Sequence, residues 1–312
     1  MQLSLAQNFF IVVIFTLFLI DCENNDRDCD VVISIDSSKG DCSEDLSYEN
    51  EVDFSISGNK RIIYSNNIPN HNVGLFGNLN GSLNPNRITP QNSRYEIDLV
   101  PSKVNSITKL LNNGPAYFFG IMLNGVELDP VAAEPWPHSK PITKNHNWEW
   151  NLEATMAGLG IDCNSAHVQP TGKYHYHGAP TLYLENLSSN LTDMIHIGWA
   201  ADGFPIYYQY GYKVADDRYS GLSRLFPSYQ LRTGERTGDG DSAPCGTYTG
   251  VYTADYEYIS GLGDLDECNG RHGVTPEFPD GTYYYIVTDK YPGIPRCFVG
   301  TPSVDFSIGP AR

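Results

Sequence analysis

Two histidines stand one residue apart in the stretch PTGKYHYHGAP, residues 170–180. His175 and His177 alternate with Tyr174 and Tyr176, and the whole chain has only eight histidines. In an extended strand, residues i and i+2 point to the same face. The pattern therefore predicts that both imidazoles project from one side of a strand. Neutral imidazole nitrogen at such a position can bind zinc, copper or iron.

Further ligands for a metal lie close in the sequence. His196 stands in the strand-like run DMIHIGWAADG, and His167 precedes His175 by a short turn. Asp202 follows His196 at a strand end, where a carboxylate can bind a metal or orient a histidine. We predict a zinc or copper site formed by His175, His177 and His196, with His167 or Asp202 as fourth ligand and a position open to water or substrate. The Tyr–His alternation also suits ordinary sheet packing, so the isolated motif leaves a purely structural role open.

The same residues allow three classes of function. The first is transition-metal binding without catalysis. The second is a metal-dependent hydrolase, in which activated water or a pair such as His177 with Glu153 acts as nucleophile or base; its catalytic candidates are Glu153, Asp202 and His167. The third is a non-enzymatic carbohydrate- or protein-binding surface module, because the 21 tyrosines offer flat rings for sugars. Covalent serine catalysis is disfavoured, since no Gly-x-Ser-x-Gly nucleophile elbow occurs.

Charge limits the partners. The chain has 37 acidic and 20 basic residues, for a formal net charge of −17. An acidic chain without a basic cluster repels phosphate backbones, so we expect no nucleic-acid partner. A small-molecule or glycan ligand remains compatible with this composition.

The N-terminus predicts export. Residues 9–20, FFIVVIFTLFLI, form an apolar run that is short for a membrane span, and we predict a signal peptide over 1–21. An uncleaved N-terminal anchor is the alternative, and no later segment is apolar enough to cross a membrane. Residues 22–50 are acidic and polar and are expected to form a flexible leader. The expected location is secreted or cell-surface, either extracellular or periplasmic.

The cysteines agree with an oxidising compartment. Cys22 directly follows the apolar run, and lipid attachment there stays open. The remaining six are even in number, which favours disulfides in an exported chain. The sequence leaves the disulfide connectivity open. The most economical pairing joins Cys29 with Cys42, Cys268 with Cys297, and Cys163 with Cys245.

From residue 51 the pattern is a succession of short β-branched and aromatic runs separated by Gly, Pro, Asn and Asp. The predicted strands are VDFSIS, KRIIYS, RYEIDLV, AYFFGIML, WEWNLE, KYHYH, MIHIGWA, FPIYY, SYQLR, TYTGVYTADYEYI, TYYYIVT and VDFSI. Short helices are expected near 151–160 and 180–189. We predict a mainly β chain, with a single sandwich- or barrel-like domain over 51–312, long loops and a few short helices.

Several separated segments resemble the YHYH-domain family, which is named for the tetrapeptide Tyr174–His177. They are NGVELDPVAAEPW, LGIDCNSAHVQPTGKYHYHG, HIGWAADGFPIYYQYGY and DLDECNGRHGVTPEFPDGTYYYIVTDKYPGIPRCFVG, in that order along the chain. The resemblance covers roughly residues 60–310 and implies an exported or surface protein, but it implies no particular activity. It also directs attention to polar residues near turns: Glu134, Trp136, Glu153, Asp202, Asp264, Asp266, Asn269 and Arg271.

Overall fold

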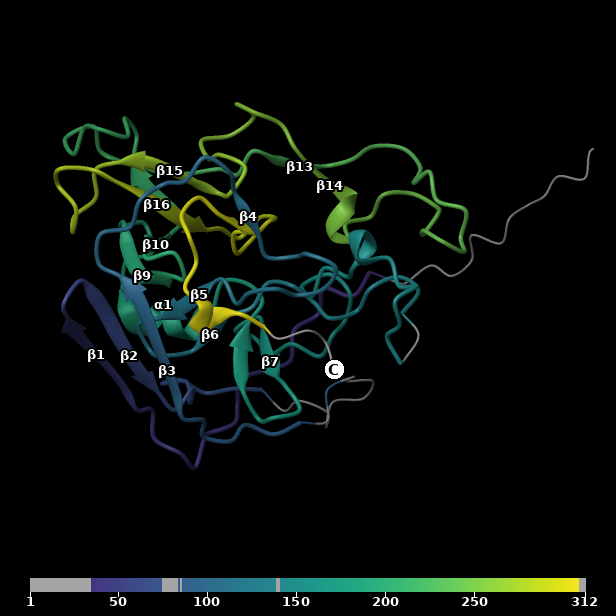
Figure 1. The fold of residues 1–312 in the computed structure, drawn as a ribbon, viewed down its shortest axis with the longest axis horizontal. Coiled ribbons are helices and arrows are strands. Elements are labelled where there is room, and N and C mark those ends of the chain that lie inside the picture. Colours follow the sequence, from purple (N-terminus) through teal and green to yellow (C-terminus); the bar gives the residue numbers. More distant parts are fainter. Residues whose placement is uncertain (1–34, 75–83, 85, 139–140, 309–312) are drawn as a thin grey trace, which may run out of the picture.

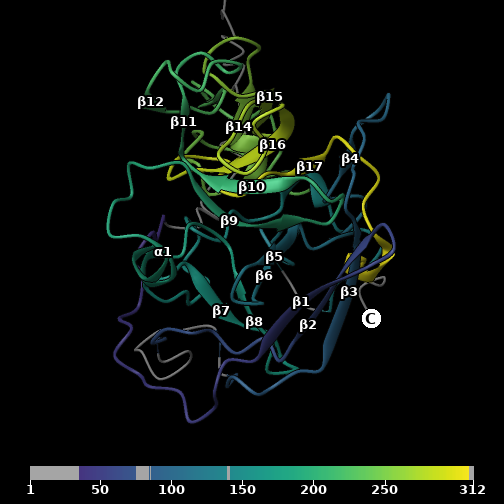
Figure 2. The ribbon, with the colours of Figure 1, turned by 90° about the vertical axis from the view of Figure 1, so that its left-hand side faces the viewer.

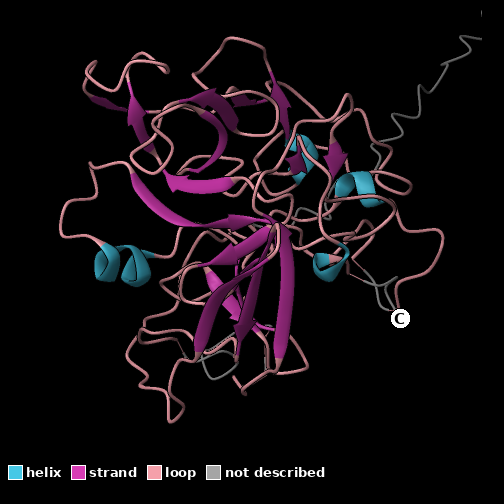
Figure 3. Ribbon diagram, turned by 60° about the vertical axis from the view of Figure 1, so that its left-hand side comes forward, coloured by secondary structure: helices cyan, strands magenta, loops and turns pink. Residues whose placement is uncertain are grey.

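Strands and turns make up most of the described chain, which in this computed structural model comprises residues 35–74, 84, 86–138 and 141–308 (Figure 1). Among these residues there is a single α-helix, α1 (Thr181–Leu187). Three short 3₁₀ helices accompany it: η1 (Trp148–Trp150), η2 (Thr253–Asp255) and η3 (Val304–Phe306). Figure 3 shows the helices as small peripheral pieces around the strands. The mainly β prediction is confirmed.

The largest sheet is mixed and has eight strands in the order β15-β16-β10-β9-β5-β6-β8-β7. Figure 2 shows how it runs from β15 and β16 at one end of the molecule to β7 and β8 at the other. The pairs β10·β16 and β6·β8 are parallel and the others are antiparallel. In the order of the sheet, the strands span Gly270–Gly273, Thr282–Val287, Pro205–Tyr208, Ile195–Ala200, Gly120–Met122, Glu127–Leu128, Tyr174–Tyr176 and Ala166–Val168.

A second, antiparallel sheet contains β1 (Val52–Ser57), β2 (Lys60–Ser65) and β3 (Ser93–Asp98). Three further two-stranded sheets are short. They pair β11 (Tyr210–Tyr212) with β12 (Leu222–Arg224), β13 (Tyr229–Leu231) with β14 (Tyr256–Tyr258), and β4 (Thr108–Lys109) with β17 (Cys297–Phe298). None of the described sheets closes into a barrel, so the arrangement is open and layered.

The main core lies where the three-stranded sheet faces the large sheet. Ile63 and Ile97 of the smaller sheet are fully buried together with Ile121 of β5. The Phe119 ring stacks on the Phe298 ring with centroids 5.4 Å apart, which adds aromatic contact to the apolar burial. At the rim of this contact, the Arg61 guanidinium lies 3.3 Å from the centre of the Trp199 ring of β9. The rigid large sheet therefore holds β7 and β8, which carry the histidine motif.

Most predicted strands and one predicted helix are present, and four predicted elements differ. One of them, the TYTGVYTADYEYI run, contains η2 and is a strand only at β14. The WEWNLE and VDFSI runs form the 3₁₀ helices η1 and η3, and each run makes an isolated bridge in place of a ladder, Leu152 with Tyr252 and Ser307 with Tyr117. The helix near 180–189 is α1. The helix expected near 151–160 is absent, since Gly158 and Gly160 adopt left-handed φ values of 63° and 69° that an α-helix does not allow.

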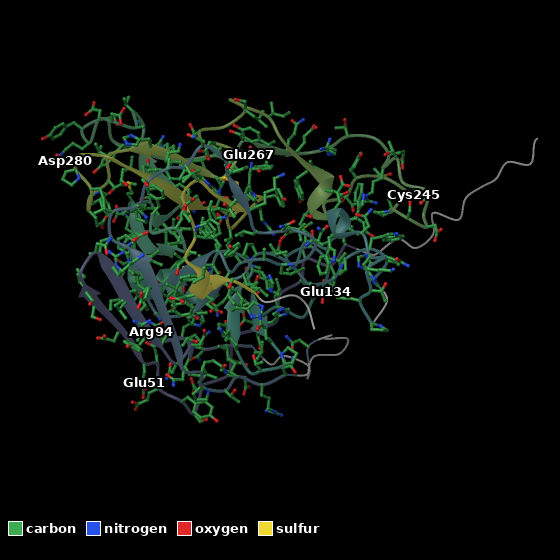
Figure 4. All side chains as sticks on the ribbon, in the orientation of Figure 1. Glu51, Arg94, Glu134, Cys245, Glu267 and Asp280 are labelled. Atoms are coloured by element: carbon green, nitrogen blue, oxygen red, sulfur yellow. A yellow bond between two sulfur atoms is a disulfide. The ribbon has the colours of Figure 1, made fainter. Side chains whose placement is uncertain are left out.

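The disulfides correct part of the predicted pairing. Cys268 bonds Cys297 as expected, but Cys42 bonds Cys163 across 121 residues. The predicted Cys29–Cys42 and Cys163–Cys245 pairs are therefore wrong, because the fold brings the segment that carries Cys42 beside the loop before β7. Cys245 also takes part in a disulfide. Figure 4 shows it at the opposite end of the molecule from Asp280.

The described part of the predicted leader contacts the rest of the fold. Besides the Cys42 bond, Asp36 forms a parallel bridge with Ala157, and Glu44 forms an antiparallel bridge with Val73. The predicted signal peptide, residues 1–21, lies outside the described residues. Among the residues that are described, no helix has the length and apolar character needed to span a membrane.

Candidate metal centre

A tight hairpin positions the first two histidines of the site. β7 and β8 are antiparallel, and His167 is the direct partner of His175. Directly opposed residues of a ladder project from the same face. Between the strands, Gly172 has a φ of 86°, and a β-carbon there would lie 2.0 Å from the Thr89 hydroxyl oxygen. Only glycine fits this turn, which explains its place just before the histidine motif.

Three imidazoles converge on one face of this hairpin. The Nε2 atom of His177 lies 3.0 Å from the Nε2 atom of His175 and 3.0 Å from that of His167. One nitrogen from each residue can be chosen so that all lie within 4.8 Å of one another. His175 and His177 are 2% and 3% exposed, and His167 is partly buried. His175 and His177 therefore share one face, as predicted, and His167 lies against them from the neighbouring strand.

Hydrogen bonds at Nδ1 fix the orientation and the tautomer of two of these imidazole rings. Nδ1 of His167 lies 2.9 Å from the Leu159 carbonyl oxygen, and Nδ1 of His175 lies 3.3 Å from the Lys173 carbonyl oxygen. A carbonyl only accepts, so each Nδ1 carries the hydrogen and each Nε2 presents a lone pair. Nδ1 of His177 is buried and has no hydrogen-bond partner among the described residues. Three nitrogens facing each other in this way match the donor set of a transition-metal ion.

Burial also keeps the rings in the form that binds metals. It lowers the pKa of His167, and it lowers the pKa of His175 and His177 well below their usual range. For the last two, the neighbouring imidazoles are a further cause. All three histidines are thus neutral at pH 7, so a metal ion need not displace a proton from any of them.

Two acidic residues that the sequence analysis missed lie beside the histidines. β6 is parallel to β8 with Glu127 next to His175, and the Asp129 amide donates to the Tyr176 carbonyl, so Asp129 continues this register. Glu127 accepts from the Lys173 ammonium at 2.9 Å. One oxygen of each carboxyl group is buried without a hydrogen-bond partner within the described chain. Both carboxyl groups thus place an oxygen without a hydrogen-bond partner beside the histidine strand, while the charge of Glu127 is already paired with Lys173.

Asp129 is a special case among them. Burial, with Glu127 as the second cause, raises the pKa of Asp129 to about 8. The signal in the sequence was the i, i+2 spacing of Glu127 and Asp129 within NGVELDP, the same period that marks the histidine pair. Strand periodicity predicts that these two side chains share a face, but their place beside the histidines depends on the pairing of β6 with β8.

A cavity of about 630 Å³ connects the cluster with the surface. His177 is the one histidine of the cluster that lines it, and Glu153 lies in the same wall. Glu153 is 3% exposed, is paired with Arg296 at 2.6 Å and accepts from the Thr155 hydroxyl at 3.0 Å. A ligand in the cavity would thus reach the cluster from the His177 side, next to the Glu153 carboxyl group that Arg296 and Thr155 hold in place.

The structure does not bring His196 or Asp202 to this cluster. His196 lies on β9, and β5 and β6 separate β9 from β8. Its Nε2 atom hydrogen-bonds the Gly198 carbonyl at 2.9 Å, and its ring packs against Trp199. The strand predicted around His196 is present as β9, but the two strands between it and β8 come from earlier in the sequence.

Asp202 holds the turn between β9 and β10. Its carboxylate accepts from the Tyr285 hydroxyl at 2.6 Å and from the Gly300 amide at 2.9 Å, and burial raises its pKa to about 6. Similarly, Asp266 accepts from the Cys268 and Gly270 amides in its own turn. These acidic residues stabilise turns, which is a common role of aspartate.

Geometry and sequence comparison together define the chain as a β-rich protein with a buried three-histidine cluster open to one cavity. The family described as "YHYH protein" matches residues 94–300, and the chain belongs to this family. Neither the curated proteins nor the solved structures contain a match.

Proposed function

We propose that this protein binds one zinc or copper ion through His167, His175 and His177. The observation that carries the proposal is the convergence of three buried Nε2 atoms, two of which present lone pairs because their Nδ1 atoms face carbonyls. The nearby Glu127 and Asp129 carboxyl groups add support, since each has a buried oxygen without a hydrogen-bond partner in the described chain.

Elemental analysis of untagged protein tests the proposal directly. Purified protein should carry about one transition-metal ion per chain, as three- and four-ligand sites do. The His175→Ala/His177→Ala variant should lose this metal, whereas His196→Ala, which removes a histidine outside the cluster, should retain it. Wild-type protein that is isolated metal-free and takes up neither zinc nor copper on addition would disprove the proposal.

The donor set limits the kind of metal site. All three ligands are imidazole nitrogens, and Cys163, the nearest cysteine in sequence, is in a disulfide. A site without thiolate excludes a blue-copper centre and favours zinc or a copper site with nitrogen ligands only. Electron paramagnetic resonance of the copper-loaded protein would show coupling to several nitrogen nuclei, and this coupling should weaken in His167→Ala.

A metal-dependent hydrolase is the second candidate, and the cavity favours it. Of the catalytic candidates from the sequence, His167 is a ligand in the proposed site and Asp202 holds a turn. Glu153 alone of the three lines the cavity together with His177. The metal would supply a Lewis acid, and the Glu153 carboxylate would accept a proton from water in the cavity. Turnover of ester, phosphoester or glycan substrates that is lost with chelator and in Glu153→Gln supports this function, and uniform inactivity favours binding alone.

We further propose that the protein is secreted or cell-surface. The Cys42–Cys163 and Cys268–Cys297 disulfides support this location, because disulfides persist in oxidising compartments. Sequencing the N-terminus of protein recovered outside the expressing cells would test the predicted cleavage after residue 21. Recovery of the full-length chain in membranes would instead indicate an uncleaved anchor.

A further inference from the structure

The cavity above the histidine cluster has a floor, a wall and a rim that differ in chemistry. Its buried floor contains His177, Glu153, Ser165 and Gly178. Its wall is rich in tyrosine: Tyr208, Tyr229, Tyr256 and Tyr291. Its exposed rim contains Lys39, Asp289 and Lys290. A concave site with an aromatic wall and a few charged groups has the general features of a small-molecule site.

The charges of the lining carboxylates are already compensated. Glu153 pairs with Arg296 at 2.6 Å at the floor. At the rim, Asp289 pairs with Arg224 at 2.8 Å and accepts from the Tyr208 hydroxyl at 2.7 Å. Neither carboxylate therefore needs a cation from a ligand, and both are held in place by their partners.

The two lining lysines have no such compensation. Within the described chain, neither Lys39 nor Lys290 has a carboxylate within ion-pair distance, while the lining carboxylates have their arginine partners. The Lys290 ammonium lies 5.5 Å from the centre of the Phe226 ring, and Lys39 is close enough to Asp289 for their charges to interact. The rim thus presents two lysine ammonium groups without an ion-pair partner in the described chain, although Asp162 and Asp289 act on Lys39 from a greater distance. The acidic remainder of the protein repels anions. An anion would therefore be attracted only close to these two lysines.

The wall supplies a flat and rigid surface beside these charges. The Tyr256 and Tyr291 rings are stacked, with centroids 3.8 Å apart and planes at 3°. Tyr229 meets Tyr291 edge-on at 5.5 Å, so Tyr291 is fixed from two sides. Aromatic faces of this kind pack against the apolar face of a sugar or against another ring.

We propose that this cavity binds a small anion that carries a ring, with its carboxylate or phosphate at Lys39 and Lys290 and its ring on the tyrosine wall. A monosaccharide or disaccharide acid fits a space of about 630 Å³. This inference names a ligand class for the cavity and does not rest on the proposed metal site, since none of the lysines and tyrosines that carry it is a proposed metal ligand.

Isothermal titration calorimetry with matched probes tests the proposal. Glucuronate and glucose 6-phosphate carry both anion and ring, glucose carries only the ring, and acetate and inorganic phosphate carry only the anion. Wild-type protein should bind at least one of the two anionic sugars about tenfold more tightly than glucose and than the matching ringless anion, and added salt should weaken this binding. Which of the two anionic sugars binds also shows whether the site prefers a carboxylate or a phosphate.

Variants separate the rim from the rest of the surface and from the metal. Lys39→Ala/Lys290→Ala should weaken the anionic sugar about tenfold. The control Lys60→Ala/Lys213→Ala removes the same charge elsewhere and should bind as wild type. In chelator-treated protein, His167→Ala/His175→Ala, which removes two histidines of the cluster that do not line the cavity, should keep this affinity, so loss of the metal and loss of the anion are read separately. Equal binding of glucose, no binding of either anionic sugar, or an unchanged affinity in Lys39→Ala/Lys290→Ala would overturn the proposal.

Discussion

Acidification of the metal-free protein should weaken the fold through the histidine cluster. Burial holds the pKa of His175 and His177 well below the ordinary value of 6.5. The unfolded chain therefore takes up protons at these residues while the native chain does not. Their contribution to stability is full above pH 6.5 and decreases as the pH falls from there toward the native pKa values.

The size of the effect follows from proton linkage. Between pH 7 and pH 5.5, one histidine of this kind lowers the free energy of unfolding by about 1.3 kcal/mol, and two lower it by about 2.5 kcal/mol. Three buried aspartates act in the opposite direction, because their native pKa values are raised. These values are about 8 for Asp129 and about 6 for Asp162 and Asp202. The measurement must therefore compare two variants that share these aspartates.

Urea unfolding of chelator-treated protein at a series of pH values provides this comparison. The difference in unfolding free energy between wild type and His175→Gln/His177→Gln should change by about 2.5 kcal/mol from pH 7 to pH 5.5, and His175→Gln alone should give about half of that. Proton NMR titration of the native wild type gives a second readout that does not need the variants to fold well. A difference that is independent of pH, or native His175 and His177 resonances that titrate near 6.5, would refute the reasoning.

Three other changes test parts of the same framework. Arg296→Met leaves the Glu153 carboxylate buried without its cation and should lower the unfolding free energy by about 3–5 kcal/mol, as measured by urea denaturation; a change below about 1 kcal/mol would contradict the assigned pair. Cys268→Ala/Cys297→Ala opens a loop closed across 29 residues and should cost about 3 kcal/mol in the same assay, whereas unchanged stability under oxidising conditions would speak against that disulfide. Gly172→Ala forces a side chain into the turn before the histidine motif and should both lower the melting temperature and reduce metal content; wild-type metal content would show that the turn does not position the ligands.

The sequence predicted the chemistry of the hairpin better than its surroundings. Strand periodicity is a local property, so the shared face of His175 and His177 could be derived from their spacing alone. Spacing alone could not decide whether His167 or His196 is the third histidine of the cluster. Both lie in strand-like runs at a plausible distance along the chain, and only the order of strands in the sheet decides which one becomes a neighbour.

The same limit explains the other differences. Glu127 and Asp129 come close to the histidines through a parallel pairing of β6 with β8, which no local pattern reveals. The Cys42–Cys163 bond joins residues 121 positions apart and likewise depends on the tertiary fold. Composition and alternation sufficed for the β class and for most strands, whereas the helix expected near 151–160 is absent, since Gly158 and Gly160 have left-handed φ values.

The long-range Cys42–Cys163 disulfide joins two segments that contribute to the proposed ligand cavity. Cys42 stands three positions after Lys39, and Cys163 stands three positions before β7. One covalent bond thus fastens the segment that bears a rim lysine to the hairpin that bears the histidines. In a reducing environment this segment would be held by noncovalent contacts such as the Gly40 amide to the Ile161 carbonyl. Oxidation of this cysteine pair therefore fixes Lys39 at the cavity covalently, and reduction would leave its position to those weaker contacts.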